Sequence, residues 1–304
     1  MLHESLLKAI KAARLAGCEI LEVYNKNIEI EYKDDRSPIT LADKNANKAI
    51  TNALSRTELN GEKIPILSEE GKTQPFDNRK NWNCFWLIDP LDGTKEFIKR
   101  NGEFTVNIAL IHKNHPAAAV IYIPVEDTFY FSADNIGAYR LRNSRIIDDI
   151  IADKNNLDNT GYNELLSRII AKSEKLPSAS LPDKPTILLG SRSHISNEFG
   201  QFMNKLKETS EDIEIKSFGS SIKFCKIAEG EAHIYARLGK TMEWDTAAGH
   251  HIVEQTGGKV LNAETKTPLI YNKENLLNPF FIVIRQGLDD KTILKACDGI
   301  YDSD

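Results

Sequence analysis

The feature that most restricts the fold is a short apolar run that stops abruptly at a turn. It reads Phe85-Trp86-Leu87-Ile88 and is followed at once by Asp89-Pro90-Leu91-Asp92-Gly93-Thr94. The apolar run has the length of a buried strand, and Pro90 lacks the N–H group that strand pairing requires, so we expect the pairing to end there. Asp89 and Asp92 then lie together at the mouth of a strand. Gly93 lets the backbone come close to a bound group.

Thr94 begins a short predicted helix at the same point. Free N–H groups at a helix start attract anions, while the two carboxylates attract cations. The stretch can therefore hold a cation and an anion side by side. The pattern Asp-Pro-x-Asp-Gly is also ordinary turn chemistry, and taken alone it leaves that alternative open.

Acidic residues occupy comparable positions elsewhere in the chain. Asp43 lies in the first turn of a predicted helix, and Asp245 immediately precedes another. Glu69 and Glu70 follow a short apolar strand at residues 64–67. Each position has a simpler explanation, which we prefer for each taken singly: Asp43 favours the helix dipole, Asp245 is an N-cap, and the two glutamates form a solvated loop.

The second half of the chain offers a matching basic position. Ser220, Ser221 and Lys223 begin a predicted helix, where N–H groups, hydroxyls and an ammonium can bind a phosphate. A serine N-cap followed by an exposed lysine is the simpler alternative. His250 and His251 are adjacent on a predicted helix and face different directions, so we interpret them as packing or surface residues rather than metal ligands.

Hydrophobic periodicity divides the chain into two parts of different class. The first part has amphipathic helices at residues 3–26 and from residue 38, and then an antiparallel meander predicted at residues 105–112, 118–122, 128–131 and 138–141. From residue 186 strands and helices alternate up to a last strand at 276–284, which is typical of an α/β arrangement. We therefore expect an α+β lobe over residues 1–185 and an α/β lobe over residues 186–304. Residues 143–185 are interpreted as an irregular excursion between the lobes, with one helix at 162–175.

Composition limits the partners and the compartment. The chain has 304 residues and a formal net charge of -5, which argues against a general nucleic-acid or anionic-membrane surface. An anionic substrate would need local help from metal ions. The four cysteines lie far apart and fit free thiols in a reducing cytosol. Charged residues interrupt the apolar pattern at the N-terminus, and no apolar run reaches membrane-spanning length, so we expect a cytoplasmic protein.

The order of these acids is more specific than any one of them. Asp43, Glu69-Glu70, the stretch 89–94 and Trp244-Asp245 together resemble the signature of the magnesium-dependent, lithium-sensitive phosphatase superfamily that includes inositol monophosphatase. Longer strings at residues 89–109, 190–194, 219–225 and 244–250 are similar to the bacterial 3'(2'),5'-bisphosphate nucleotidases of that superfamily. The resemblance implies a layered α-β-α-β-α fold whose two lobes enclose the site.

The same resemblance implies a role for each matched residue. Glu69, Asp89 and the carbonyl of Leu91 would hold one Mg²⁺, while Asp89, Asp92 and Asp245 would hold a second. Asp43 and Thr94 would prepare the attacking water, and Glu69 would assist through a third, weaker ion. Glu70 would support these ligands without contacting the metal itself.

Substrate contacts are implied in the same way. The reacting phosphate would lie against Leu91, Asp92, Gly93, Thr94 and Asp245. The nucleoside and its second phosphate would lie against His194, Ser220, Lys223 and Arg237, each of which has the alternative of being a solvated surface residue.

The implied activity is removal of the 3'-phosphate from 3'-phosphoadenosine 5'-phosphate, and from its 5'-phosphosulfate analogue, in sulfur assimilation. Two alternatives stay open: a phosphatase for inositol phosphate or another sugar phosphate, and an inactive metal- or nucleotide-binding protein. The oligomeric state and a peripheral association with the membrane also stay open.

Overall fold

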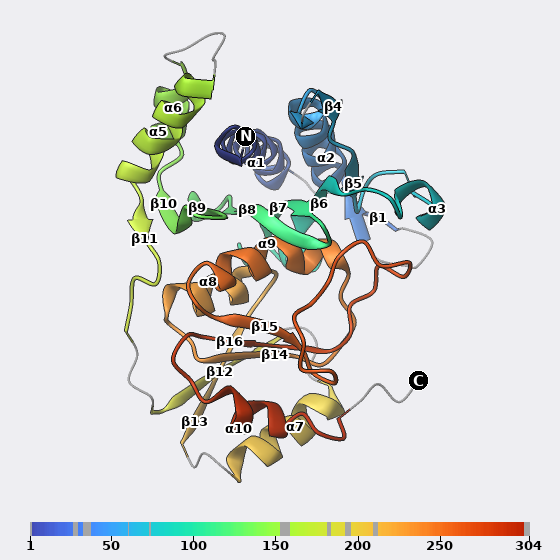
Figure 1. Cartoon of the computed structure of the whole chain (residues 1–304), viewed down its shortest axis with the longest axis vertical. Helices are drawn as coiled ribbons and strands as arrows, with labels where there is room; N and C mark the ends of the chain where they lie inside the picture. The colour runs from blue at the N-terminus through green and yellow to red at the C-terminus, as the bar shows by residue number, and fades with distance from the viewer. Residues whose placement is uncertain are drawn as a thin grey trace.

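The computed structural model describes residues 2–26, 30–32, 38–59, 61–72, 74–152, 159–180, 184–191, 196–208 and 212–300. Its helices and sheets stack in the order helix, sheet, helix, sheet, helix (Figure 1). Helices α1 (Leu2–Tyr24) and α2 (Leu41–Leu54) cover the outer face of the first sheet, and α8 (Ile222–Glu229) and α9 (Glu243–Glu254) lie between the two sheets. The layered fold predicted from the sequence is confirmed.

The first sheet has seven strands in the order β11-β10-β9-β8-β7-β6-β5. Its central members are β6 (Cys84–Asp92), β7 (Thr105–His112), β8 (His115–Ile123), β9 (Thr128–Ala133) and β10 (Gly137–Arg142). From β6 to β10 each strand pairs antiparallel with the next, which confirms the predicted meander. β5 (Ile66–Ser68) adds to β6 in the parallel direction.

Both faces of this sheet are buried, because helices cover each of them. Successive residues of a strand point to opposite sides, so they enter different cores. In β6, Trp86 and Ile88 pack in a core shared with α1 and α2, whereas Phe85 and Leu87 pack in a second core shared with α8 and α9. The run therefore reads as continuously apolar although it has two faces.

The second sheet has five strands in the order β13-β12-β14-β16-β15. Their bounds are β12 (Thr186–Ser191), β13 (Ile213–Phe218), β14 (Ile234–Arg237), β15 (Lys259–Asn262) and β16 (Phe281–Ile284). β12 pairs parallel with both neighbours, while β16 runs antiparallel to β14 and β15. α7 (Asn197–Lys207) and α10 (Asp290–Lys295) cover its outer face through a third core. The last strand is shorter than predicted and begins at Phe281 instead of residue 276.

Residues 143–185 are more regular than the sequence suggested. They contain α5 (Arg145–Ala152), α6 (Asn159–Ala171) and β11 (Glu174–Lys175). α6 packs beside α1, where the Lys8 ammonium lies 5.7 Å from the centre of the Tyr162 ring. β11 extends the first sheet by pairing with β10. The predicted helix at 162–175 therefore ends early, because its last residues are recruited as a strand. The division into lobes at residue 185 stays a prediction.

Pairing in β6 differs from the sequence-based expectation. The strand does not end before Pro90: Asp89 pairs with Asn107 and Asp92 pairs with Thr105, with a register shift between them. Three steps along β6 thus match two steps along β7. In a regular strand, residues three apart point to opposite faces, and the extra residue brings Asp89 and Asp92 to the same side.

Smaller elements complete the part of the chain that the structure describes. β1 (Ile30–Tyr32) pairs antiparallel with β2 (Pro38–Thr40) just before α2, and β3 (Glu58–Leu59) pairs with β4 (Glu62–Lys63). α3 (Phe76–Arg79) precedes β6, and α4 (Thr94–Ile98) follows it. Among the described helices, none has the length and apolar character needed to cross a membrane.

Candidate active site

The turn after β6 brings the two halves of the chain into contact. Gly93 has φ +93° and directly precedes α4. A Cβ at this glycine would lie 3.1 Å from the carbonyl oxygen of Glu103 and 3.3 Å from the Cβ of Ser220. Both the positive φ and the lack of space require glycine here. The turn can therefore lie directly against the loop that leads into α8.

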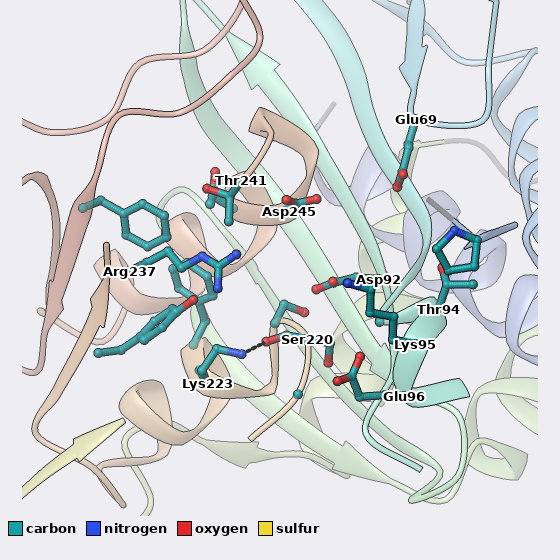
Figure 2. A pocket seen from close by; sticks show the side chains of 18 residues that line it. Glu69, Asp92, Thr94, Lys95, Glu96, Ser220, Lys223, Arg237, Thr241 and Asp245 are labelled. Atoms are coloured by element: carbon teal, nitrogen blue, oxygen red, sulfur yellow. Dashed lines mark hydrogen bonds between the residues drawn. The ribbon is translucent and has the colours of Figure 1, made fainter. Parts of the chain in front are cut away.

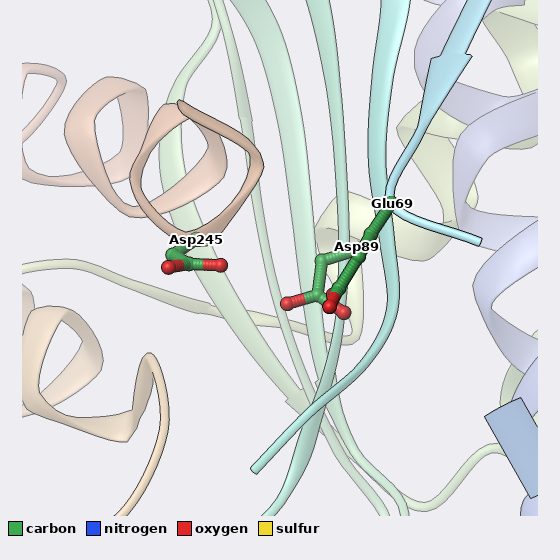
Figure 3. Close-up of side chains that lie close together, drawn as sticks. All are labelled: Glu69, Asp89 and Asp245. Carbon is green, nitrogen blue, oxygen red and sulfur yellow. The ribbon is translucent and has the colours of Figure 1, made fainter. Parts of the chain in front are cut away.

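Three carboxylates from separate elements converge beside this turn. Glu69 follows β5, Asp89 belongs to β6, and Asp245 belongs to α9 (Figure 3). One oxygen from each lies within 4.8 Å of the others. Asp245 is the third residue of α9 and accepts a hydrogen bond from the backbone N–H of Met242 at 2.8 Å. The helix thus begins earlier than predicted, and Asp245 caps it from inside instead of preceding it.

The electrostatics of this group fit a divalent metal ion. Burial, with the neighbouring charges of Glu69 and Asp92, raises the pKa of Asp89 well above its usual range. Burial, with Asp92 and Glu69 nearby, likewise raises the pKa of Asp245 well above its usual range. Carboxylates packed this closely repel one another unless a cation or protons neutralise them. Oxygen donors of this kind suit hard cations such as Mg²⁺.

Asp92 and Leu91 lie at the edge of this group. Burial raises the pKa of Asp92 to about 6, while Lys223 opposes the shift. The backbone N–H of Leu91 donates to Asp89 Oδ1 at 3.0 Å, which fixes that carboxylate. Among the described residues the tight carboxylate group leaves out both Asp92 and Glu70. The backbone carbonyl of Glu70 accepts a hydrogen bond from Asn47 Nδ2 at 3.1 Å.

Asp43 serves two purposes with its two oxygens. Oδ2 accepts from the backbone N–H and the hydroxyl of Thr40, at 2.7 and 2.6 Å, and so closes a capping box at the start of α2. Oδ1 accepts from the Thr94 hydroxyl at 3.1 Å. Burial raises the pKa of Asp43, although these hydrogen bonds oppose the shift. The helix-start explanation is therefore correct for Asp43, and its second oxygen is bonded to Thr94 as well.

Lys223 and its neighbours form the opposite side. Lys223 is buried, contrary to the simpler alternative of an exposed lysine, and its ammonium donates to the carbonyls of Phe218 at 3.0 Å and Ser220 at 2.6 Å. Burial lowers its pKa to about 8, while Asp92 opposes the shift. Arg237 Nη2 donates to the carbonyl of Lys240 at 2.7 Å. Within the part of the chain that is described, Arg237 Nε and Ser220 Oγ are buried atoms with no hydrogen-bond partner.

Most of these residues line one pocket of about 240 Å³, namely Glu69, Asp92, Gly93, Thr94, Ser220, Lys223, Arg237 and Asp245. Asp43, Asp89 and Leu91 are not part of its lining. Figure 2 shows Glu69 and Thr94 on one side and Lys223 and Arg237 on the other, with Asp92 and Asp245 between them. We call Glu69, Asp89, Asp92 and Asp245 the acidic wall, and Ser220, Lys223 and Arg237 the basic wall. Of the residues predicted for the substrate, His194 lies outside the described residues.

Sequence reasoning missed part of the lining. The missed residues include Pro38, Lys95, Glu96, Phe224, Tyr235, Thr241, Thr246 and Phe281. Tyr235 could have been found, because it lies two residues before Arg237 on β14 and so faces the same side of the strand. Pro38 and Thr241 carry no such signal, since only the folding of the chain brings the start of β2 and the segment before α9 to the pocket. His250 and His251 are buried and bonded to Tyr271 and Ser132, which confirms that they are packing residues.

The five layers and the acid-lined pocket agree with a family assignment made independently from the whole sequence. The chain belongs to the inositol monophosphatase family, whose model matches residues 2–296.

Similar proteins carry a more particular name. A solved structure described as CysQ from Bacteroides thetaiotaomicron, a bacterial member of the inositol monophosphatase family, is 42% identical, with a TM-score of 0.81 over 95% of this chain and 99% of that one. The 3'(2'),5'-bisphosphate nucleotidase CysQ of Buchnera aphidicola is 41% identical over 85% of this chain and 84% of its own length. The protein of the same name from Salmonella typhimurium is 38% identical over 91% and 98%.

Proposed function

We propose that this protein is a Mg²⁺-dependent phosphomonoesterase that removes the 3'-phosphate from 3'-phosphoadenosine 5'-phosphate. The observation that carries the proposal is a single pocket in which an acidic wall faces a basic wall. Relatives at 38–41% identity that bear the name of this activity, over most of both chains, support it. The 5'-phosphosulfate analogue differs only beyond the 5'-phosphate, so we propose it as a second substrate.

The acidic wall is proposed to hold two or three Mg²⁺ ions. Glu69, Asp89 and Asp245 present oxygens within 4.8 Å of one another, and we assign Asp92 and the Leu91 carbonyl as the remaining ligands. Bound Mg²⁺ supplies Lewis acidity, lowers the pKa of bound water and neutralises the phosphate that approaches the carboxylates. The raised pKa values of Asp89 and Asp245 support this assignment. Each carboxylate is costly to ionise in this buried group, and a bound cation would supply the positive charge that offsets the cost.

Thr94 and Asp43 are proposed to take the proton from the attacking water. The Thr94 hydroxyl donates to Asp43 Oδ1 at 3.1 Å and lies 3.5 Å from the Leu91 carbonyl. A water that loses its proton to Thr94 Oγ1 would drive the Thr94 proton onto Asp43. The raised pKa of Asp43 makes its carboxylate a better proton acceptor, which favours this direction.

The basic wall is proposed to bind the part of the substrate that does not react. Arg237 Nε and Ser220 Oγ are buried beside the pocket, and no described residue satisfies them. A phosphate oxygen can accept from both kinds of group, and a guanidinium suits a planar, two-point contact. Among the residues predicted for this role, Ser220, Lys223 and Arg237 line the pocket.

The proposal is tested by phosphate release from three substrates in the presence of Mg²⁺. These are 3'-phosphoadenosine 5'-phosphate, inositol 1-phosphate and fructose 1,6-bisphosphate. We expect the nucleotide to have the highest kcat/KM, because only it places a second phosphate on a nucleoside. Preference for either sugar phosphate would contradict the nucleotidase proposal and leave the acid-lined site intact. No release from any of the three would favour a binding protein.

We also propose that the protein works in a reducing cytosol. The four cysteines are free, and two of them, Cys225 and Cys297, are buried. Burial raises the pKa of Cys297 to about 11, so its thiol stays protonated and unreactive.

A further inference from the structure

A buried polar cluster connects the two halves of the chain directly beneath the acidic wall. It consists of Thr105 and Asn107 on β7 and of Ser221, the residue that precedes α8. Their exposed fractions are 0%, 1% and 2%, so these polar groups depend on partners within the protein. The Ser221 hydroxyl donates to Asn107 Oδ1 at 2.7 Å and lies 2.7 Å from the Thr105 hydroxyl.

The side-chain amide of Asn107 reaches from this cluster to the acidic wall. Its Nδ2 donates to Asp92 Oδ2 at 3.4 Å. The extra residue in β6 makes this contact geometrically accessible, since it sets Asp92 opposite Thr105 and Asp89 opposite Asn107 on one face. Asn107 thus lies behind two of the four carboxylates of the acidic wall.

The orientation of the Asn107 amide follows from its partners. Asn107 Oδ1 accepts from the Ser221 hydroxyl at 2.7 Å, and the Thr105 hydroxyl lies 3.2 Å from the same oxygen, within donating distance. If the amide were reversed, Oδ1 would face the carboxylate of Asp92, and two acceptors would repel each other. An ionised Asp92 and a donating Ser221 therefore select the same orientation.

We propose that Asn107 is a positioning residue that aims the Asp92 carboxylate for metal binding, and that Ser221 holds Asn107 in that orientation. This inference rests on the proposed function through the assignment of Asp92 as a metal ligand. Its consequence is a physical link between the two walls. The loop that carries Ser220 and leads to Lys223 is bonded through Ser221 and Asn107 to a carboxylate on the other side. Displacing that loop therefore loosens Asp92.

The test compares Asn107→Leu with Ser221→Ala. Leucine keeps the approximate volume of asparagine and removes both hydrogen bonds. Titration calorimetry with Mg²⁺ and metal-free protein, without substrate, measures the metal affinity directly. We expect Asn107→Leu to weaken Mg²⁺ binding about 10- to 100-fold, the usual cost of removing a group that orients a metal ligand. The KM for the nucleotide at saturating Mg²⁺ should stay unchanged, a split that general loss of structure would not produce.

Ser221→Ala tests the second step of the link. It should weaken Mg²⁺ binding in the same direction and by less than Asn107→Leu. The double variant should bind no more weakly than Asn107→Leu alone, because Ser221 acts through Asn107. If Asn107→Leu fails to fold, Ser221→Ala still decides the matter by its own loss of Mg²⁺ affinity.

Ser132→Ala is the matched control. Ser132 is also fully buried in the first sheet, but its hydroxyl is bonded to His251. We expect its Mg²⁺ affinity to equal that of the unaltered protein. Normal Mg²⁺ affinity in folded Asn107→Leu, or strictly additive effects of the two variants, would overturn the inference alone. Failure of the unaltered protein to bind Mg²⁺ would overturn the metal assignment and the inference with it.

Discussion

The acidic and basic walls differ in how the protein balances their charges. The ammonium of Lys223 donates to two backbone carbonyls, and Arg237 Nη2 donates to a third. Arg237 Nε and Ser220 Oγ have no hydrogen-bond partner among the described residues. In the acidic wall, by contrast, burial and neighbouring carboxylates raise the pKa values of Asp89, Asp92 and Asp245. The basic wall therefore holds its donors in place with capacity left for an anion, whereas the acidic wall lacks the positive charge that its carboxylates need to ionise. We infer that metal binds before or together with the phosphate.

The largest effect is expected from Asp89→Asn. This change removes the most central charge of the acidic wall, and we expect kcat/KM to fall by about 10³-fold or more, as when a main electrostatic stabiliser of a transition state is lost. Steady-state phosphate release at several Mg²⁺ concentrations measures it. Asp77→Asn, an exposed acid on α3, is the control and should leave activity unchanged. Normal turnover by Asp89→Asn would show that the charge of the acidic wall is not needed for the reaction.

A change at Thr94 should separate proton transfer from metal binding. Thr94→Val deletes the hydroxyl that donates to Asp43, and we expect kcat to fall by about 10²- to 10⁴-fold with Mg²⁺ affinity retained. Thr94→Ser keeps the hydroxyl and should restore most of the rate. Single-turnover kinetics and Mg²⁺ titration provide the two measurements. A serine variant as slow as the valine variant would show that the methyl group of Thr94, and not its hydroxyl, is needed for the rate.

Arg237→Gln tests the basic wall by itself. We expect kcat/KM for 3'-phosphoadenosine 5'-phosphate to fall about 10- to 100-fold, the value of a hydrogen bond to a charged group. Adenosine 3'-phosphate lacks the 5'-phosphate, so its lower kcat/KM should hardly change. Equal losses for both substrates would mean that Arg237 does not recognise the second phosphate.

The smallest effect concerns thermal stability and pH. A raised carboxylate pKa means that the folded protein binds more protons than the unfolded chain, so the stability contributed by Asp92 falls as pH rises from 3.8 through about 6. Mg²⁺ replaces those protons. At Mg²⁺ concentrations about 100 times Kd, we expect Tm to rise by about 5–10 °C near pH 7.5 and by less near pH 5. Scanning calorimetry with chelator and with Mg²⁺ measures the Tm shift at each pH. Equal shifts at the two pH values would contradict the proposal that Mg²⁺ replaces protons in the acidic wall.

The sequence showed the acidic positions more plainly than it showed the burial of Lys223. Acidic residues at strand and helix ends form a pattern that is visible in the chain at Asp43, Glu69, Asp89 and Asp245. The burial of Lys223 depends instead on how closely the loop before α8 approaches the turn at Gly93, which no local pattern encodes. The pairing of Asp43 with Thr94, 51 residues away along the chain, was expected only from the family resemblance, because no local pattern connects the two residues.

Periodicity predicted the meander and the alternating strands and helices, and the family resemblance implied the layers, but neither predicted all of the edges. Residues 143–185 looked irregular because their polar and proline-containing stretches hide α5, a helix of eight residues that is too short to be stable without packing, and only α6 was predicted in part. β11 has two residues, too few for any periodicity, and its strand conformation depends on pairing with β10.

The extra residue in β6 makes the site depend on how two strands are paired. Asp89 and Asp92 are three residues apart, and with regular pairing they would point to opposite faces of the sheet. The register shift against β7 is what keeps both carboxylates on one side. The residues in between also matter, since the N–H of Leu91 holds the Asp89 carboxylate. For anyone who redesigns this pocket, the register between the two strands therefore matters as much as the acids themselves.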